Sequence, residues 1–147
     1  MVCHEPPYIM PPERKKPTVY MELCICFDRD FPIEEISGII GVHATQCGRK
    51  SDMRINPLIS KQNPGYWEYH TQHHEDYSCE SMILEMLDFL AKHRSALQHV
   101  KEAYKGEFFL RIMISAKGTC MPELRIPGDL IREADRLGAA IDVLTDQ

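Results

Sequence analysis

The densest group of metal-ligand residue types in this 147-residue sequence lies near its middle. Its members are His70, His73, His74, Glu75, Asp76 and Cys79. Zinc accepts imidazole, carboxylate and thiolate ligands, so these residue types suit it. The H-x-x-H-H spacing, however, falls at a strand end and a turn, where no helix holds two rings on one side at positions i and i+4. A solvent-exposed polar loop before the next helix explains this group better than a metal site does. We expect neither a metal nor another cofactor.

Two thiols, Cys24 and Cys26, are predicted to share one face of a strand. Side chains at i and i+2 of a strand point the same way, with Cα atoms about 6.6 Å apart. That separation and parallel aim would strain a disulfide between them. A metal site would need two more ligands from adjacent strands, so small, semi-buried side chains are the better interpretation. No C-x-x-C motif occurs, and we expect all six cysteines to be free thiols.

A third group of candidates consists of cations in and beside a long predicted loop. Arg49, Lys50 and Arg54 precede Trp67, and together they suggest a phosphate or carboxylate site. No glycine-rich cradle or helix N-terminus follows to supply backbone N–H groups. A charged loop, with Trp67 as a core anchor, explains them better. No nucleophile motif such as G-x-S-x-G is present, and we expect no enzymatic activity.

The elements that must position these residues follow from hydrophobic periodicity. Apolar residues alternate along 19–27 and 108–115, which indicates two half-buried strands. Pro32 and Gly41 bracket a short helix, and a three- and four-residue apolar spacing predicts one long helix over 80–104 with a bend at 93–95. Further strands are expected at 45–50, 66–71, 122–126 and 140–145, with a helix at 129–137. The 122–126 strand is expected to form a hairpin with 108–115.

The order of these elements, β-α-β-β-α-β-β-α-β, has short turns between consecutive strands. It predicts an α+β fold in which a mostly antiparallel or mixed sheet carries its helices mainly on one face. Residues 1–17 contain five of the ten prolines and predict a flexible arm, followed by a single domain over 18–147. The face opposite the helices would then be open. It would present Tyr20, Glu22, Phe109, Arg111 and Met113 as a partner-binding surface.

Composition and charge narrow the class of protein. The net charge of −5 and the pI near 5.8 argue against a general nucleic-acid binder, which needs a basic face. No apolar run approaches about 18 residues, so no membrane span is expected. The first residues do not resemble a signal peptide, which predicts a cytoplasmic protein.

Several short motifs together resemble the bacterial domain of unknown function 4279 family. The P-I-E-E-I helix at 32–36 ends in I-I-G, H-A-T follows at 43–45, and G-Y-W at 65–67 is similar to the family's Gly-x-Trp strand. R-K-S-D at 49–52 is similar to an arginine followed by a glycine–acidic pair, with Ser51 in the place of the glycine. The resemblance covers about residues 19–146. It implies no established activity; some relatives lie beside secreted toxins, which implies an immunity role for those.

These observations lead to two expected functions. The first is a non-enzymatic protein-binding module, either an immunity-type inhibitor of a bacterial toxin or a homodimer, in which an acidic protein masks a basic cleft. The alternative is a small-molecule or phosphate-binding sensor that uses the 49–65 loop.

Overall fold

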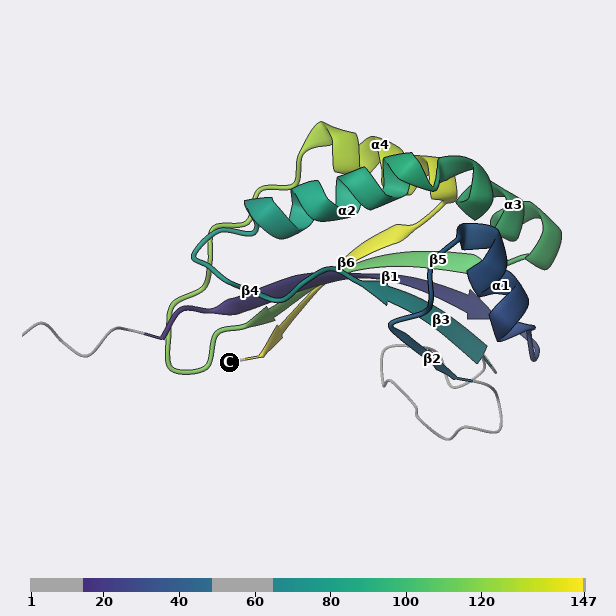
Figure 1. The fold of residues 1–147 in the computed structure, drawn as a ribbon. Helices are drawn as coiled ribbons and strands as arrows, with labels where there is room; N and C mark the ends of the chain where they lie inside the picture. Colours follow the sequence, from purple (N-terminus) through teal and green to yellow (C-terminus); the bar gives the residue numbers. More distant parts are fainter. Residues whose placement is uncertain (1–14, 49–64, 147) are drawn as a thin grey trace, which may run out of the picture.

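The fold was analysed in a computed structural model that describes residues 15–48 and 65–146 (Figure 1). The chain forms six strands and four helices in that part. In order they are β1 (Thr18–Phe27), α1 (Ile33–Ile40), β2 (Gln46–Gly48), β3 (Gly65–His70), β4 (His74–Glu75), α2 (Glu80–Lys92), α3 (Arg94–Tyr104), β5 (Glu107–Ser115), α4 (Gly128–Leu137) and β6 (Ala140–Asp146). No helix among these is long and apolar enough to cross a membrane.

The strands form one mixed sheet in the order β2-β3-β1-β5-β6, with the short β4 also pairing with β1. Every pairing is antiparallel except β5 with β6, which is parallel. All four helices lie on one side of the sheet (Figure 1). The predicted α+β class, with helices on one face of a mixed sheet, is therefore confirmed.

The main core lies between the sheet and the helix layer. The alternate side chains Val19, Met21, Leu23 and Ile25 of β1 are fully buried there, as the alternation predicted. Trp67 on β3 is also fully buried and its indole Nε1–H donates to Ser37 Oγ on α1 at 3.0 Å. The opposite faces of β1 and β5 therefore carry the remaining, more polar side chains.

The edge of the sheet differs from the prediction. Residues 122–126 form no hairpin strand and contribute only an isolated bridge between Ser78 and Glu123. The neighbour of β5 is instead β6, in parallel, because α4 returns the chain across the helix layer before β6 begins. A parallel neighbour requires such a crossover, which a short-turn pattern cannot reveal. The two-residue strand β4 was not predicted.

The long predicted helix is two helices, separated at His93. The backbone N–H of His93 donates to Phe89 O, and the carbonyl of His93 accepts from Leu97 N–H. His93 therefore ends α2 and begins α3. At the end of α3, Lys105 takes the left-handed conformation (φ 57°). The next residue, Gly106, packs closely on β1, since a Cβ there would lie 2.6 Å from Ile25 Cγ2.

Candidate functional site

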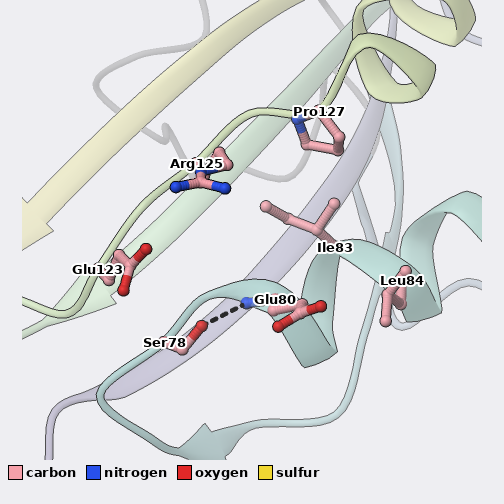
Figure 2. A pocket seen from close by; sticks show the side chains of 7 residues that line it. All are labelled: Ser78, Glu80, Ile83, Leu84, Glu123, Arg125 and Pro127. Carbon is pink, nitrogen blue, oxygen red and sulfur yellow. Dashed lines mark hydrogen bonds between the residues drawn. The ribbon is translucent and has the colours of Figure 1, made fainter.

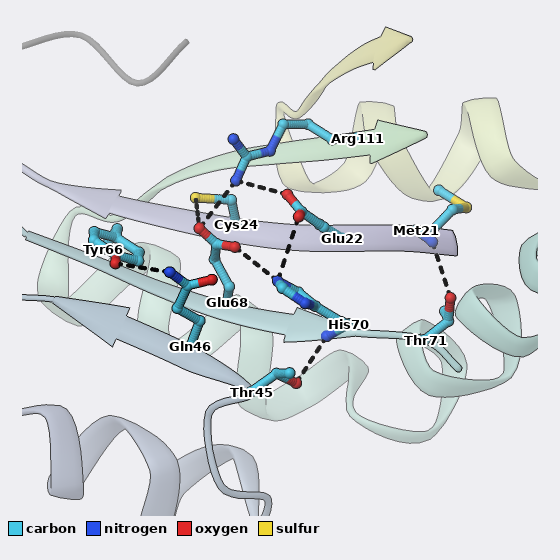
Figure 3. Close-up of polar contacts among 10 residues, drawn as sticks. All are labelled: Met21, Glu22, Cys24, Thr45, Gln46, Tyr66, Glu68, His70, Thr71 and Arg111. Atoms are coloured by element: carbon cyan, nitrogen blue, oxygen red, sulfur yellow. Dashed lines mark hydrogen bonds and ion pairs between the residues drawn. The ribbon is translucent and has the colours of Figure 1, made fainter. Parts of the chain in front are cut away.

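Charged side chains meet on the helix-free face, defined here as the side of the sheet opposite the four helices. The strand register places Glu22 on β1 between His70 on β3 and Arg111 on β5. Glu68 lies two residues before His70, so its side chain emerges on the same face (Figure 3). We call these four residues, Glu22, Glu68, His70 and Arg111, the charged cluster.

The two glutamates of the charged cluster are each contacted from two sides. Arg111 Nη2 lies 3.0 Å from Glu22 Oε2 and 3.1 Å from Glu68 Oε2. His70 Nε2 lies 2.7 Å from Glu68 Oε1 and 3.5 Å from Glu22 Oε1. The guanidinium therefore faces both Oε2 atoms, whereas the imidazole faces both Oε1 atoms (Figure 3). The contact between His70 Nε2 and Glu68 Oε1 is a hydrogen bond.

The charged cluster is buried, although no described helix lies over it. Glu22, Glu68 and Arg111 are 5%, 3% and 2% exposed. Burial raises the pKa of Glu22 above its ordinary value, although the nearby Arg111 charge lowers it. The contacts of Arg111 Nη2 with the carboxylates are ion pairs without hydrogen-bond geometry, so Glu22 Oε2 and the Arg111 Nε and Nη2 groups have no hydrogen-bond partner in the described residues. Such unmade bonds are costly in a buried site.

The two predicted strand thiols border this cluster. Cys24 Sγ lies 3.7 Å from Cys26 Sγ and 4.0 Å from Glu68 Oε2. Neither cysteine forms a disulfide, as predicted, but both are fully rather than partly buried. The hydrogen bond to Cys26, together with burial, raises the pKa of the Cys24 thiol well above its ordinary value. Cys24 is therefore a neutral thiol and a poor metal ligand or nucleophile.

The structure separates the three histidines that the sequence groups together. His70 joins the charged cluster, and His73 stacks on Tyr20 with ring centroids 3.9 Å apart. His74 Nε2 lies 3.1 Å from Glu85 Oε2 on α2. The three rings thus form no common site. The group that does converge, Glu22, Glu68 and His70, was missed because it depends on the register between β1 and β3.

The predicted partner-binding residues divide into two sets. Tyr20, Phe109 and Met113 are half-buried and reach the surface of the helix-free face. The predicted exposure of Glu22 and Arg111 is wrong, because they pair with each other across β1 and β5 and are buried. Arg111 also contacts a second carboxylate, Glu68, which was not predicted to join them.

The residues of the alternative ligand site are not brought together by the structure. Trp67 is a core anchor, as expected, and its indole N–H donates to Ser37 on α1. Its side chain is fully buried and is not available to a ligand at the surface. Arg49, Lys50 and Arg54 lie outside the described residues.

A separate surface pocket of about 200 Å³ lies at the start of α2 (Figure 2). Its lining residues are Ser78, Glu80, Ile83, Leu84, Glu123, Arg125 and Pro127. Ser78 Oγ accepts a hydrogen bond from the Glu80 backbone N–H at 3.2 Å, as a helix cap would. The pocket is smaller than the roughly 300 Å³ of typical small-molecule sites. It lies on the helix side of the sheet, and none of its lining residues belongs to the charged cluster.

Comparison with known proteins assigns the family. The family described as Domain of unknown function (DUF4279) matches residues 17–147. The chain belongs to the DUF4279 family. The match includes every element from β1 to β6, so the resemblance drawn from the short motifs is confirmed. No curated protein and no solved structure is similar enough to match. The family description carries no activity, and a function for this DUF4279 domain must be argued from its helix-free face.

Proposed function

We propose that the protein is a non-enzymatic protein-binding module that uses its helix-free face, and that it acts as an immunity-type inhibitor of a bacterial toxin. The observation that carries the proposal is the half-exposed group Tyr20, Phe109 and Met113 beside the buried charged cluster. Aromatic residues and methionine are enriched at protein interfaces. On this face, unlike the other, no described helix lies over the sheet (Figure 1).

The packing of these three residues supports a rigid contact surface. Tyr20 is stacked against His73, and Phe109 packs on the buried group Cys24, Cys26 and Tyr66. Met113 lies opposite Tyr20 in the β1–β5 register. Side chains held in place before binding lose little conformational entropy when a partner docks. The face therefore offers apolar contacts at low entropic cost.

The charge of the chain supports a basic partner. The net charge of −5 favours association with a positively charged protein, and charge complementarity raises the association rate. A nuclease-like or other basic toxin cleft has that character. The inhibitor would then act by covering the cleft, with no chemistry of its own.

Site-specific photo-crosslinking in the native host tests the proposal. A photoreactive residue would replace Tyr20, Phe109 or Met113 on the helix-free face, or Leu84 or Ile131 on the helix layer. Leu84 and Ile131 are 57% and 54% exposed, so they are the matched controls for indiscriminate contact. We expect one defined protein adduct at the three face positions and none at the controls. Adducts at the controls, or none at the face, would contradict the proposal.

The alternative of a small-molecule or phosphate sensor remains a prediction. It now depends on Arg49, Lys50 and Arg54 alone, because Trp67 belongs to the core. A rise in Tm on adding phosphate or nucleotides, lost when these three residues are replaced, would favour it.

A further inference from the structure

The charged cluster holds more carboxyl groups than cationic groups in contact with them. Two glutamate side chains, Glu22 and Glu68, share the single guanidinium of Arg111, which contacts one oxygen of each. The glutamates and the arginine are at most 5% exposed. Buried carboxyl groups are stabilised by a cation in direct contact, so the oxygens that do not face Arg111 are available to one more cation.

The side chains on the His70 side of the two carboxyl groups are a metal-ligand set. His70 Nε2 and one carboxylate oxygen from each of Glu22 and Glu68 lie within 4.8 Å of one another. His70 Nε2 forms a hydrogen bond with Glu68 Oε1 at 2.7 Å and lies 3.5 Å from Glu22 Oε1, so an ion bound here would replace that hydrogen bond with bonds to the metal. Two carboxylates and one imidazole suit a first-row divalent transition ion. Calcium and magnesium prefer oxygen ligands alone.

Arg111 does not compete for this position. Its Nη2 contacts the Oε2 atoms, on the far side of each carboxylate from His70 (Figure 3). An ion bound to both Oε1 atoms would leave these contacts in place. Metal-bound carboxylates are commonly held by such outer contacts, which orient them. The carboxyl group of Glu22, which is 5% exposed, also has an oxygen, Oε2, without a hydrogen-bond partner in the described residues. This unsatisfied buried acceptor is an independent sign that the carboxyl groups of the cluster are incompletely satisfied.

We propose that Glu22, Glu68 and His70 bind a divalent transition-metal ion such as Zn²⁺, with Arg111 as the residue that positions both carboxylates. This inference goes beyond the proposed protein-binding role and does not depend on it. It also revises the sequence-based expectation of no metal, which considered the wrong histidine partners. The ion enters from the side of His70, because the His70 side chain is 12% exposed and is the most exposed of the three ligands.

Equilibrium titration of the full-length, EDTA-treated protein with Zn²⁺ tests the site. We expect one Zn²⁺ per chain at this site, a higher Tm with Zn²⁺ than without it, and at least about a hundredfold weaker binding in His70→Ala and Glu68→Gln. The matched controls are His74→Ala and Glu85→Gln, which break the ordinary pair on the other side of the sheet. They should bind Zn²⁺ like the wild type.

Two further measurements keep the test decisive. Circular dichroism of each variant without metal establishes that it folds, and Glu68→Gln keeps the volume of the side chain if His70→Ala does not fold. Cobalt(II) bound in the site should show visible absorption bands in the wild type and in His74→Ala. A folded wild-type protein that binds no Zn²⁺ would overturn the proposal. Binding retained in Glu68→Gln and His70→Ala, or lost in the controls, would also overturn it.

Discussion

The two faces of β1 are both buried, yet they are buried in different ways. Toward the helices, Met21, Leu23 and Ile25 pack in an apolar core. On the other face, Glu22 and Cys24 are equally inaccessible but lie in a network of ion pairs and thiols. Burial of apolar area is non-directional, whereas a buried charge is tolerated only beside its partners.

The difference shows which face of the sheet constrains the sequence through packing and which constrains it through specific polar contacts. The helix-covered face needs apolar side chains of suitable volume, and volume-conserving substitutions are tolerated there. The helix-free face needs specific pairs: Arg111 with both glutamates, and His70 with Glu68. Replacing one member leaves the others unpaired, so the two faces should respond differently to substitution.

The largest loss of stability on the helix-free face is expected from Arg111→Met. The substitution leaves two buried carboxylates without their cation, and we expect it to lower the free energy of unfolding by about 3–5 kcal/mol. Lys117→Met is the control, because the Lys117–Asp146 pair is exposed and should contribute at most about 1 kcal/mol. Urea denaturation measures both. A loss below about 1 kcal/mol for Arg111→Met would show that the helix-free face is open to water.

Two adjacent residues on β5 point to opposite faces of the sheet, so substituting each of them compares the stability that the two faces contribute. Leu110 is fully buried under the helices, and Leu110→Ala should lower the free energy of unfolding by about 2–5 kcal/mol. Phe109 points to the other face and is half-buried, so Phe109→Ala should cost about 1–2 kcal/mol despite its larger side chain. The same denaturation experiment applies. Equal losses would mean that both faces are covered alike.

Thiol reactivity measures the access of solvent to each face without any substitution. Cys24 and Cys26 on the helix-free face and Cys79 beside α2 are all buried, and burial raises the pKa of the Cys79 thiol. In the native protein these three should alkylate at least about a hundredfold more slowly than the exposed Cys47 and Cys120. Mass spectrometry after timed alkylation measures each site. Rapid labelling of Cys24 and Cys26, with Cys79 protected, would place water on the helix-free face.

The smallest expected effect is a pH dependence from Glu22. Its raised pKa means that the folded chain binds this proton more tightly than the unfolded chain, whose carboxyl titrates near 4.5. Stability therefore falls as the pH rises from about 4.5 through the folded pKa, by at most about 1.4 kcal/mol per pH unit. Denaturation in EDTA should show this fall in the wild type and less of it in Glu22→Gln. An identical profile in the two proteins would contradict the raised pKa.

Much of the fold followed from the sequence because periodicity is a local signal. The alternation along 19–27 and 108–115 assigned each side chain to its face, and Gly41 ended α1 with a positive φ as expected. The parallel β5–β6 pairing was missed because it depends on a crossover through α4. The break at His93 was foreseen only as a bend. These features are set by tertiary packing rather than by local pattern.

The candidate site was harder to predict for the same reason. Glu22, Glu68 and His70 are separated by up to 48 residues, and only the register between β1 and β3 brings them together. Glu22 and Arg111 lie directly opposite each other on two strongly alternating strands, so the alternation placed both on one face. Glu68 was not predicted to join them. A polar side chain at every second position of β3, beside an apolar Trp67, was the signal that could have identified it.

We propose above all that the helix-free face is the binding surface. The decisive measurement is the affinity with which the cross-linked partner binds two matched variants of this protein. Phe109→Asp places a charge on that face, and Ile131→Asp places the same charge on the exposed side of α4. With both variants folded by circular dichroism, we expect Phe109→Asp to bind at least about tenfold more weakly and Ile131→Asp to bind like the wild type. Unchanged binding by Phe109→Asp, or a loss confined to Ile131→Asp, would contradict the account.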